Sequence, residues 1–295
     1  MATTVKEAFR QFASSVNITD RQEAAVAICK ANVIAKIKAK LQLHSEEARV
    51  IGSWDRDSII RYLSEGDVDV MVVLHYSQNK EWDTAEGTGQ VLRRFKAILD
   101  EAYPNTPCGV DRNCVTMKLS QFRLDVVPAF SIDADGYQIP DTYRQEWIRT
   151  DPVAFAERMT QINKKMDCCF KPLVKMVKAW NREVGKPLRG FHLECLLHER
   201  YKEYTQAYTY SSMMCFFFEA LPGYLAAACY DPITHDRVDG YLGINIQGSD
   251  RQKVISKAEK AARKAREALD DETKYPSVAI REWKDLLGEF FPAYG

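Results

Sequence analysis

The sequence lacks several features that would place it in a well-defined class of proteins. It has no run of about 18 apolar residues, which excludes an α-helix that spans a membrane. It has no excess of either charge, because 41 Lys and Arg balance 41 Asp and Glu, whereas proteins that coat nucleic acid usually carry a basic excess. Its first residues contain no apolar stretch typical of a signal peptide. Its eight cysteines show no regular spacing, so we expect reduced thiols and a cytoplasmic protein.

The hydrophobic periodicity predicts strands in the first half of the chain and helices in the second. Helices are expected at residues 18–43, 87–102, 152–165, 167–184, 190–204, 208–228, 250–270 and 276–288. Strands are expected at 68–74, 113–119 and 122–130, and residues 131–151, rich in Asp, Gly, Pro and Thr, are expected to form a loop. This order predicts an α+β core with a long N-terminal helix in residues 1–150, followed by a helical domain in residues 151–295.

Two aspartates stand at the start of the first predicted strand. Asp67 and Asp69 alternate with aliphatic residues, so both side chains lie on one face of the strand, about 7 Å apart. Two carboxylates on a half-buried strand repel each other and lose hydration, and a divalent cation between them removes that cost. Magnesium uses one or two carboxylates and completes its ligand shell with water and substrate phosphates.

A third carboxylate and a glycine turn extend this pattern. Asp125 lies within another aliphatic strand, so three carboxylates converge if the two strands are neighbours. Two metal ions held in this way stabilise the attacking and leaving oxygens of a phosphoryl displacement. Gly52 lets backbone N–H groups approach a phosphate closely, and Ser53 adds a hydroxyl donor. Asp-x-Asp alone is common on surface strands and turns, but the whole combination indicates a metal-dependent phosphoryl-transfer site.

These motifs resemble those of the nucleotidyltransferase superfamily with a DNA-polymerase-β-like palm. Within it, the chain is similar to the bacterial CD-NTases, the cGAS/DncV-like enzymes of the SMODS type. Besides Gly52-Ser53 and Asp67-Val68-Asp69, the resemblance includes the segments 175–180, 191–194, 231–232 and 283–292. It covers nearly the whole chain and implies a mixed-sheet palm followed by a helical C-terminal domain.

The resemblance implies roles for seven residues. Asp67, Asp69 and Asp125 would hold Mg²⁺, with Mn²⁺ as the alternative metal, and would be the catalytic residues. Nucleotide binding would fall to Gly52, Ser53, Lys178 and Phe191, with Lys178 on the triphosphate and Phe191 stacked on a base. Without the resemblance, Lys178 would be interpreted as a solvated lysine and Phe191 equally well as a core residue.

The sequence departs from the family pattern at two places. Gly190 stands where the family often has a serine that contacts phosphate, so this contact is missing or is made by the backbone. Asp57 and Ser58 replace the usual small residue and threonine, which leaves the second half of the glycine turn in doubt. A separate feature is the basic face of Lys253, Lys257, Lys260 and Lys264, which is expected to be solvated, with RNA or a partner as the alternative.

The resemblance implies an enzyme that joins nucleoside triphosphates, with ATP and GTP favoured, into a cyclic di- or trinucleotide second messenger. The messenger would serve bacterial antiphage (CBASS) defence and would be sensed by an effector protein. We expect no requirement for nucleic acid and no membrane association. Tyr201 and Tyr204 are expected to add base-stacking surface. The alternatives are a nucleotidyltransferase acting on an RNA 3′-end or a small molecule, and a nucleotide-binding module that has lost catalysis.

Overall fold

The computed structural model describes residues 1–132, 136–205, 208–243 and 248–295. The chain forms two compact units, one of residues 18–156 and one that combines residues 1–17 with residues 157–295. The sequence analysis divided the chain into 1–150 and 151–295. The structure instead adds the first 17 residues to the C-terminal unit, and the boundary falls within helix α6 (Pro152–Lys165).

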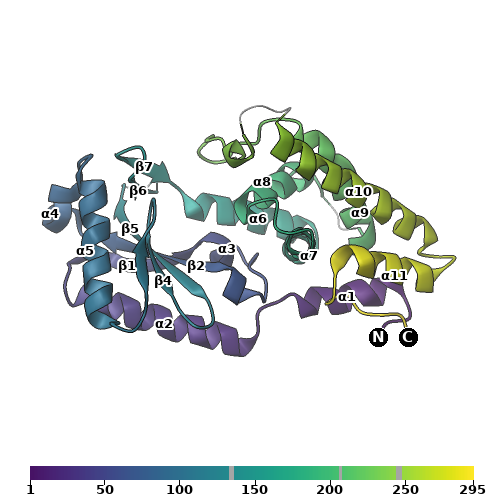
Figure 1. The fold of residues 1–295 in the computed structure, drawn as a ribbon, viewed down its shortest axis with the longest axis horizontal. Helices are drawn as coiled ribbons and strands as arrows, with labels where there is room; N and C mark the ends of the chain where they lie inside the picture. The colour runs from purple at the N-terminus through teal and green to yellow at the C-terminus, as the bar shows by residue number, and fades with distance from the viewer. Residues whose placement is uncertain (133–135, 206–207, 244–247) are drawn as a thin grey trace. The chain divides into compact units, whose positions relative to one another are not determined.

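A mixed sheet organises the unit of residues 18–156 (Figure 1). Five strands follow the order β1-β2-β5-β4-β3, and β6 pairs with both β5 and β7. The strands are β1 (Leu43–Ile51), β2 (Asp67–Leu74), β3 (Cys108–Val110), β4 (Val115–Lys118), β5 (Arg123–Ser131), β6 (Tyr137–Asp141) and β7 (Glu146–Thr150). The β2–β5 pair is parallel and the other pairs are antiparallel. The mixed sheet confirms the predicted α+β palm.

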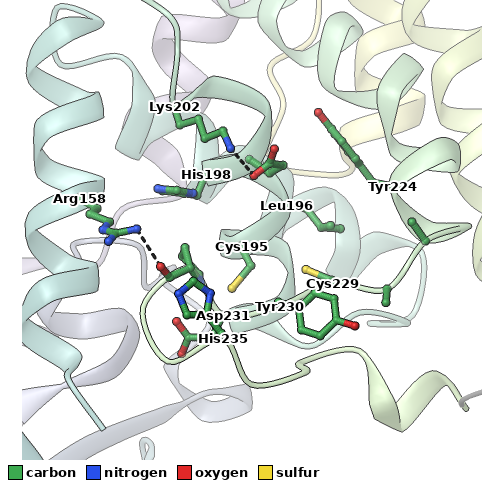
Figure 2. Close-up of a pocket in the computed structure, with 14 residues that line it drawn as sticks. Arg158, Cys195, Leu196, His198, Lys202, Tyr224, Cys229, Tyr230, Asp231 and His235 are labelled. Carbon is green, nitrogen blue, oxygen red and sulfur yellow. Dashed lines mark hydrogen bonds and ion pairs between the residues drawn. The ribbon is translucent and has the colours of Figure 1, made fainter.

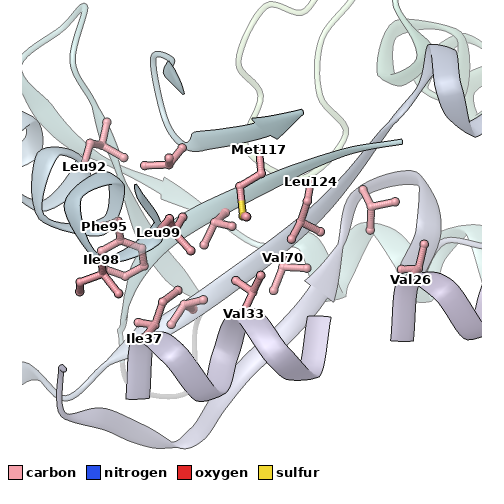
Figure 3. Close-up of a cluster of buried hydrophobic side chains, with 14 of the residues drawn as sticks. Val26, Val33, Ile37, Val70, Leu92, Phe95, Ile98, Leu99, Met117 and Leu124 are labelled. Atoms are coloured by element: carbon pink, nitrogen blue, oxygen red, sulfur yellow. The ribbon is translucent and has the colours of Figure 1, made fainter. Parts of the chain in front are cut away.

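One face of this sheet is packed against helices α2 (Asp20–Lys38) and α5 (Gly87–Ala102) (Figure 3). Val68, Val70 and Val72 of β2 point to this face, where they are fully buried. Because side chains alternate along a strand, Asp67 and Asp69 point to the opposite face. The hydrophobic core therefore fixes the direction of the two carboxylates.

The predicted loop at 131–151 is wrong, because this segment contains strands β6 and β7. Its polar residues are satisfied by long-range contacts that composition does not reveal. Asp141 is fully buried and forms an ion pair with Arg112, and the Asn113 side chain donates to the carbonyl of Pro140 at 2.6 Å. Strand β1 also lacked a prediction, and its residues are mostly half-buried, without the alternation of a strand that buries one face.

The second unit consists of helices. They are α1 (Val5–Ser15), most of α6, α7 (Phe170–Glu183), α8 (Gly190–Tyr201), α9 (Tyr210–Leu225), α10 (Ser249–Asp271) and α11 (Pro276–Leu287). Aromatic side chains of α1 and α11 meet in its core, where the Phe9 ring lies 5.0 Å from that of Trp283. Short helical elements complete the chain at α3 (Gly52–Asp55), α4 (Tyr76–Asn79), η1 (Leu63–Glu65), η2 (Lys80–Trp82) and η3 (Gly240–Leu242). Among the described residues, no helix combines the length and apolar character needed to cross a bilayer.

Candidate active site

Two of the three aspartates lie side by side on the face of the sheet opposite α2 and α5, because of the register between β2 and β5. In this parallel pair Asp69 stands directly beside Asp125, and Asp67 stands beside Arg123. Adjacent strands are about 4.8 Å apart, so the carboxylates of Asp69 and Asp125 share one small region. The two strands are thus neighbours, the condition under which the sequence predicts convergence.

The carboxylate of Asp125 carries an unused hydrogen-bonding group. Its Oδ1 atom is buried and has no hydrogen-bond partner among the described residues. Burial raises the pKa of Asp125, a hydrogen bond from Thr116 opposes that rise, and the charge of Asp67 adds to it. Burying a polar atom without a partner is costly, so this oxygen indicates a position for a ligand that is charged or donates a hydrogen bond.

Gly52 approaches the carboxylate of Asp69 more closely than any other residue type could. Strand β1 ends at Ile51, which pairs with Asp69, and the chain turns at Gly52 with a φ of +72°. A Cβ atom on Gly52 would lie 2.1 Å from Oδ2 of Asp69. Glycine is favoured here for two reasons: the backbone is left-handed, and a Cβ atom would clash with the carboxylate of Asp69.

The carbonyl group of Ser53 accepts several of the hydrogen bonds that hold the turn after Gly52. The carbonyl of Ser53 accepts the N–H groups of Ser58 at 2.9 Å and Ile59 at 3.0 Å, and also the Ser58 hydroxyl at 3.2 Å. Ser58 is fully buried and Asp57 adopts a φ of +50°. Asp57 and Ser58, which depart from the family pattern, therefore both shape this turn.

The donor set suits a hard divalent cation, although the three carboxylates do not surround one point. Among the residues that the structure describes, no group of three or more His, Cys, Asp or Glu side chains is arranged to hold a metal ion. Asp67 instead forms an ion pair with Arg123. Asp69 and Asp125 remain side by side, and Mg²⁺ needs only one or two carboxylates when substrate phosphates supply the rest. The unpartnered oxygen of Asp125 fits such an ion.

Arg123 and Thr116 are features of this site that the sequence analysis missed. Thr116 faces Asp125 across the β4–β5 pair, and Arg123 faces Asp67 across the β2–β5 pair. The alternation of β5 offered a signal, because Arg123 is two residues before Asp125 and must share its face. Thr116 needed the strand register, which the sequence does not contain.

The other two expected nucleotide-binding residues belong to the helical unit. Lys178 on α7 forms an ion pair with Glu194 on α8 at 2.5 Å, and their side chains are 10% and 0% exposed. The interpretation of Lys178 as a solvated lysine is therefore wrong. Phe191 is half-buried in the first turn of α8. A Cβ atom on Gly190 would lie 3.7 Å from Cε of Lys178, an ordinary contact, so the Lys178 side chain does not require this glycine.

Two further expectations have different outcomes. Tyr201 is fully buried and donates a hydrogen bond to the carbonyl of Met213 at 2.5 Å, so its expected role as a base-stacking surface is wrong. The basic face on α10 is partly engaged, since Lys257 donates to the carbonyl of Val184 at 2.6 Å and Lys253 pairs with Asp250 at 3.0 Å.

Comparisons with known proteins identify relatives of the whole chain. The family model described as Second Messenger Oligonucleotide or Dinucleotide Synthetase domain (SMODS) matches residues 3–163. A cyclic AMP-AMP-AMP synthase of Acinetobacter sp. (strain ATCC 27244 / 9458) is 29% identical over 276 residues, which are 87% of this chain and 77% of the relative. The CBASS oligonucleotide cyclase CdnC of Escherichia coli is 27% identical over 171 residues, which are 55% of this chain and 53% of the relative.

Solved structures with the same fold cover nearly all of the chain. The Vibrio cholerae DncV cyclic AMP-GMP synthase, described as a prokaryotic cGAS homolog, matches with a TM-score of 0.74 and 12% identity over 96% of this chain and 97% of its own. CdnC of E. coli MS115-1, solved in complex with HORMA-deltaN, matches with a TM-score of 0.71 and 16% identity over 97% and 98%. At these identities the similarity shows the fold.

Proposed function

Because the chain belongs to the family of Second Messenger Oligonucleotide or Dinucleotide Synthetase domains, we propose that it makes a cyclic di- or trinucleotide from nucleoside triphosphates with Mg²⁺. It is a nucleotidyltransferase of the cyclic oligonucleotide synthase class. The observation that carries this proposal is the placement of Asp69 beside Asp125, with the Gly52 turn against Asp69. The proposed role is in CBASS antiphage defence, with a separate effector protein that senses the product. The Acinetobacter relative, named for an adenine product, supports ATP as a substrate.

The proposed site divides the work among residues of the sheet. Asp69 and Asp125 would hold the divalent cation, with Asp67 as a third carboxylate once its ion pair with Arg123 opens. When bound, the cation supplies positive charge that stabilises the phosphate oxygens and favours the ionised form of the attacking hydroxyl. The backbone at Gly52 and the hydroxyl of Ser53 would orient the donor triphosphate, because a glycine turn brings N–H groups close to phosphate.

Asp125 is the proposed proton acceptor for the hydroxyl that attacks the α-phosphate. Asp125 lies beside Asp69 in the proposed cation site, where a carboxylate close to the attacking hydroxyl can take up its proton. Pyrophosphate is the leaving group, and a second transfer within the linear intermediate would close the ring.

Lys178 and Phe191 are proposed contacts for the triphosphate and a base. Support for Lys178 comes from Glu194, whose carboxylate lies 2.5 Å from the ammonium group and orients it. An ammonium group is a compact cation with three N–H donors, which suits phosphate oxygens. Phe191 retains partial exposure at the start of α8, as stacking on a base requires. We also propose that the protein acts in the cytoplasm, in agreement with its eight free thiols.

The experiment that tests this function starts from nucleoside triphosphates alone. The purified full chain is incubated with the four labelled triphosphates and Mg²⁺ or Mn²⁺, and the products are treated with phosphatase and identified by mass spectrometry. We expect a short product that resists phosphatase, because a ring has no terminal phosphate. A ladder of linear products that lengthens only when RNA is added would instead establish the alternative of a tailing enzyme.

A further inference from the structure

A hollow of about 590 Å³ lies in the helical unit between α8 and the segment that follows α9. None of its lining residues has a proposed role in nucleotide transfer. Two cysteines line it, Cys195 from α8 and Cys229 from the segment after α9. Figure 2 shows their side chains with the two sulfur atoms turned toward the same part of the hollow.

The two thiols differ in exposure and interact with each other. Cys195 is buried, with 3% of its surface exposed, whereas Cys229 is half-buried and accessible from the hollow. Its interactions with Cys195 and with His192 outweigh burial and lower the pKa of Cys229 below its ordinary value. The same interaction with Cys229 raises the pKa of Cys195. Cys229 is therefore the thiol of the pair that ionises more readily, and Cys195 is the proton donor.

The orientation of His192 follows from a short chain of hydrogen bonds. The backbone N–H of Arg189 donates to the hydroxyl oxygen of Tyr241 at 2.9 Å, and that oxygen lies 2.9 Å from Nδ1 of His192. Because the oxygen already accepts from Arg189, its own hydrogen is available to Nδ1. This contact occupies Nδ1 and leaves Nε2 as the ring nitrogen available to Cys229, whose pKa the interaction with His192 lowers. His192 is 1% exposed, so the ring is fixed.

Other cysteines in the chain show how unusual this arrangement is. Burial raises the pKa of Cys215 to about 11 and that of Cys114 to about 12, so both remain protonated and unreactive. Over the described ranges no group of three or more His, Cys, Asp or Glu side chains has the geometry of a metal site. The pair of Cys195 and Cys229 therefore points to thiol chemistry.

We propose that Cys195 and Cys229 form an oxidisable thiol pair, in which hydrogen peroxide attacks at Cys229 and Cys195 completes a disulfide bond. The Cys229 thiolate attacks one peroxide oxygen, which breaks the O–O bond and gives a sulfenic acid and hydroxide; the hydroxide takes up the proton that Cys229 had released. Cys195 then attacks the Cys229 sulfur, and its proton leaves with the hydroxide as a second water. The two thiols lose two electrons, and one peroxide becomes two waters.

The bond would tie α8 to the segment after α9. The residue before Cys195 is Glu194, the ion-pair partner of Lys178, so the cross-link would anchor α8 next to that pair. A cross-link between distant parts of a chain restricts the unfolded state. We therefore expect the oxidised protein to melt several degrees above the reduced protein, and a dithiol reductant to reverse the shift.

The test uses the full chain, reduced and then treated with hydrogen peroxide in small excess. Remaining thiols are alkylated, the protein is digested without reductant, and peptides are identified by mass spectrometry. We expect a linked peptide that contains Cys195 and Cys229 and is lighter than the sum of its parts by two hydrogens. Recovery of both cysteines on separate alkylated peptides would overturn the proposal. So would zinc that copurifies with the chain and is lost on Cys229→Ser.

Three variants separate the pair from general oxidation. With Cys195→Ser, the sulfenic acid should accumulate at Cys229 and be trapped by dimedone, which does not require a disulfide to form. Cys229→Ser should abolish both the linked peptide and the rise in melting temperature. Cys215→Ser, which removes another buried thiol, should leave both unchanged. Dimedone labelling spread evenly over the other cysteines would contradict a special role for Cys229.

Discussion

Asp125 and Asp239 are both shielded aspartates, but the protein surrounds them in opposite ways. Asp239 in the helical unit is fully buried and forms ion pairs with Arg237 at 2.8 Å and Arg251 at 2.5 Å. Burial would raise its pKa, but the hydrogen bonds from these arginines lower it well below the usual range. Asp125 on the sheet has a raised pKa and an oxygen without a partner among the described residues.

The difference separates a carboxylate that supports the fold from one that is proposed to bind a ligand. The partners of Asp239 belong to the chain, and Arg251 is itself fully buried and donates to the carbonyls of Leu225 and Gly243, both at 3.0 Å. Asp125 lacks an equivalent cation on its own strand pair, because Arg123 pairs with Asp67. Protein cations satisfy Asp239, and the proposed cation would satisfy Asp125.

The largest expected effect is on catalysis by the sheet carboxylates. Replacing Asp67 and Asp69 together by asparagine should lower product formation by several orders of magnitude, because neutral amides no longer hold the cation. Stability without metal should change little, since the loss of carboxylate repulsion is offset by the loss of the partly exposed ion pair between Asp67 and Arg123. Product analysis and thermal melts measure the two effects. Asp270→Asn on the exposed face of α10 is the control, and undiminished turnover by the double variant would refute the metal site.

Removing the carboxylate of Asp239, which supports the fold, should act mainly on stability rather than on product formation. Asp239→Asn leaves the buried guanidinium of Arg251 without its ion-pair partner, so we expect a loss of about 3–5 kcal/mol in the free energy of unfolding. Urea denaturation followed by circular dichroism gives this value. An unchanged unfolding curve would mean that Asp239 and Arg251 contribute little, and the contrast between the two aspartates would fail.

A smaller effect is expected from Gly52→Ala. The substitution forces alanine into a left-handed backbone, at a cost of about 1–2 kcal/mol, and pushes the carboxylate of Asp69 away from the new Cβ atom. We expect turnover to fall by about 10- to 100-fold, which is about 1.4–2.7 kcal/mol in transition-state stabilisation. Gly109→Ala is a matched control, because a Cβ atom there meets nothing within 4 Å. Equal activity of the two variants would contradict the close approach.

The smallest effect is the pH dependence of stability, which should have opposite signs at the two aspartates. The raised pKa of Asp125 means that the folded state binds its proton more tightly than the unfolded state. Its favourable contribution is therefore present below the unfolded pKa of about 3.9 and is lost as pH rises through the folded pKa. The lowered pKa of Asp239 gives the reverse, with stability present above the unfolded pKa and lost as pH falls.

Urea titrations of the wild type, Asp125→Asn and Asp239→Asn between about pH 3.5 and 8 measure this difference. As pH rises, the wild type should lose stability relative to Asp125→Asn and gain stability relative to Asp239→Asn. Parallel curves for all three proteins would show that neither carboxyl group has a shifted pKa.

The sequence predicted those parts of the protein that depend on local periodicity. The helices expected at 87–102 and 152–165 have the same bounds in the structure, because each combines an apolar stripe with clear ends. Asp67 and Asp69 could be placed on one face for the same reason, since strand alternation is local.

Features that depend on register or distant partners could not be predicted. The placement of Asp69 beside Asp125 needed the parallel pairing of β2 with β5, and the contact of Gly52 with Asp69 needed the β1–β2 register. Tyr201 follows Phe191 on the same helix, but only the packing of α8 shows that it points into the core. Asp239 and Arg251 gave no local signal that they meet. The roles of the site residues stay predictions.

The contact between the two ends of the chain has a consequence for synthesis. Residues 18–156 form a continuous unit, whereas α1 packs with α7, α9 and α11, and Ala2 pairs with Tyr294. During synthesis, α1 leaves the ribosome before the sheet unit, and α11 leaves after it. The sheet unit can fold while the apolar side chains of Phe9 and Phe12 still lack the aromatic ring of Phe291. A nascent chain stalled before α11 would thus expose the apolar face of α1. This state is prone to aggregation and is one that a chaperone would protect.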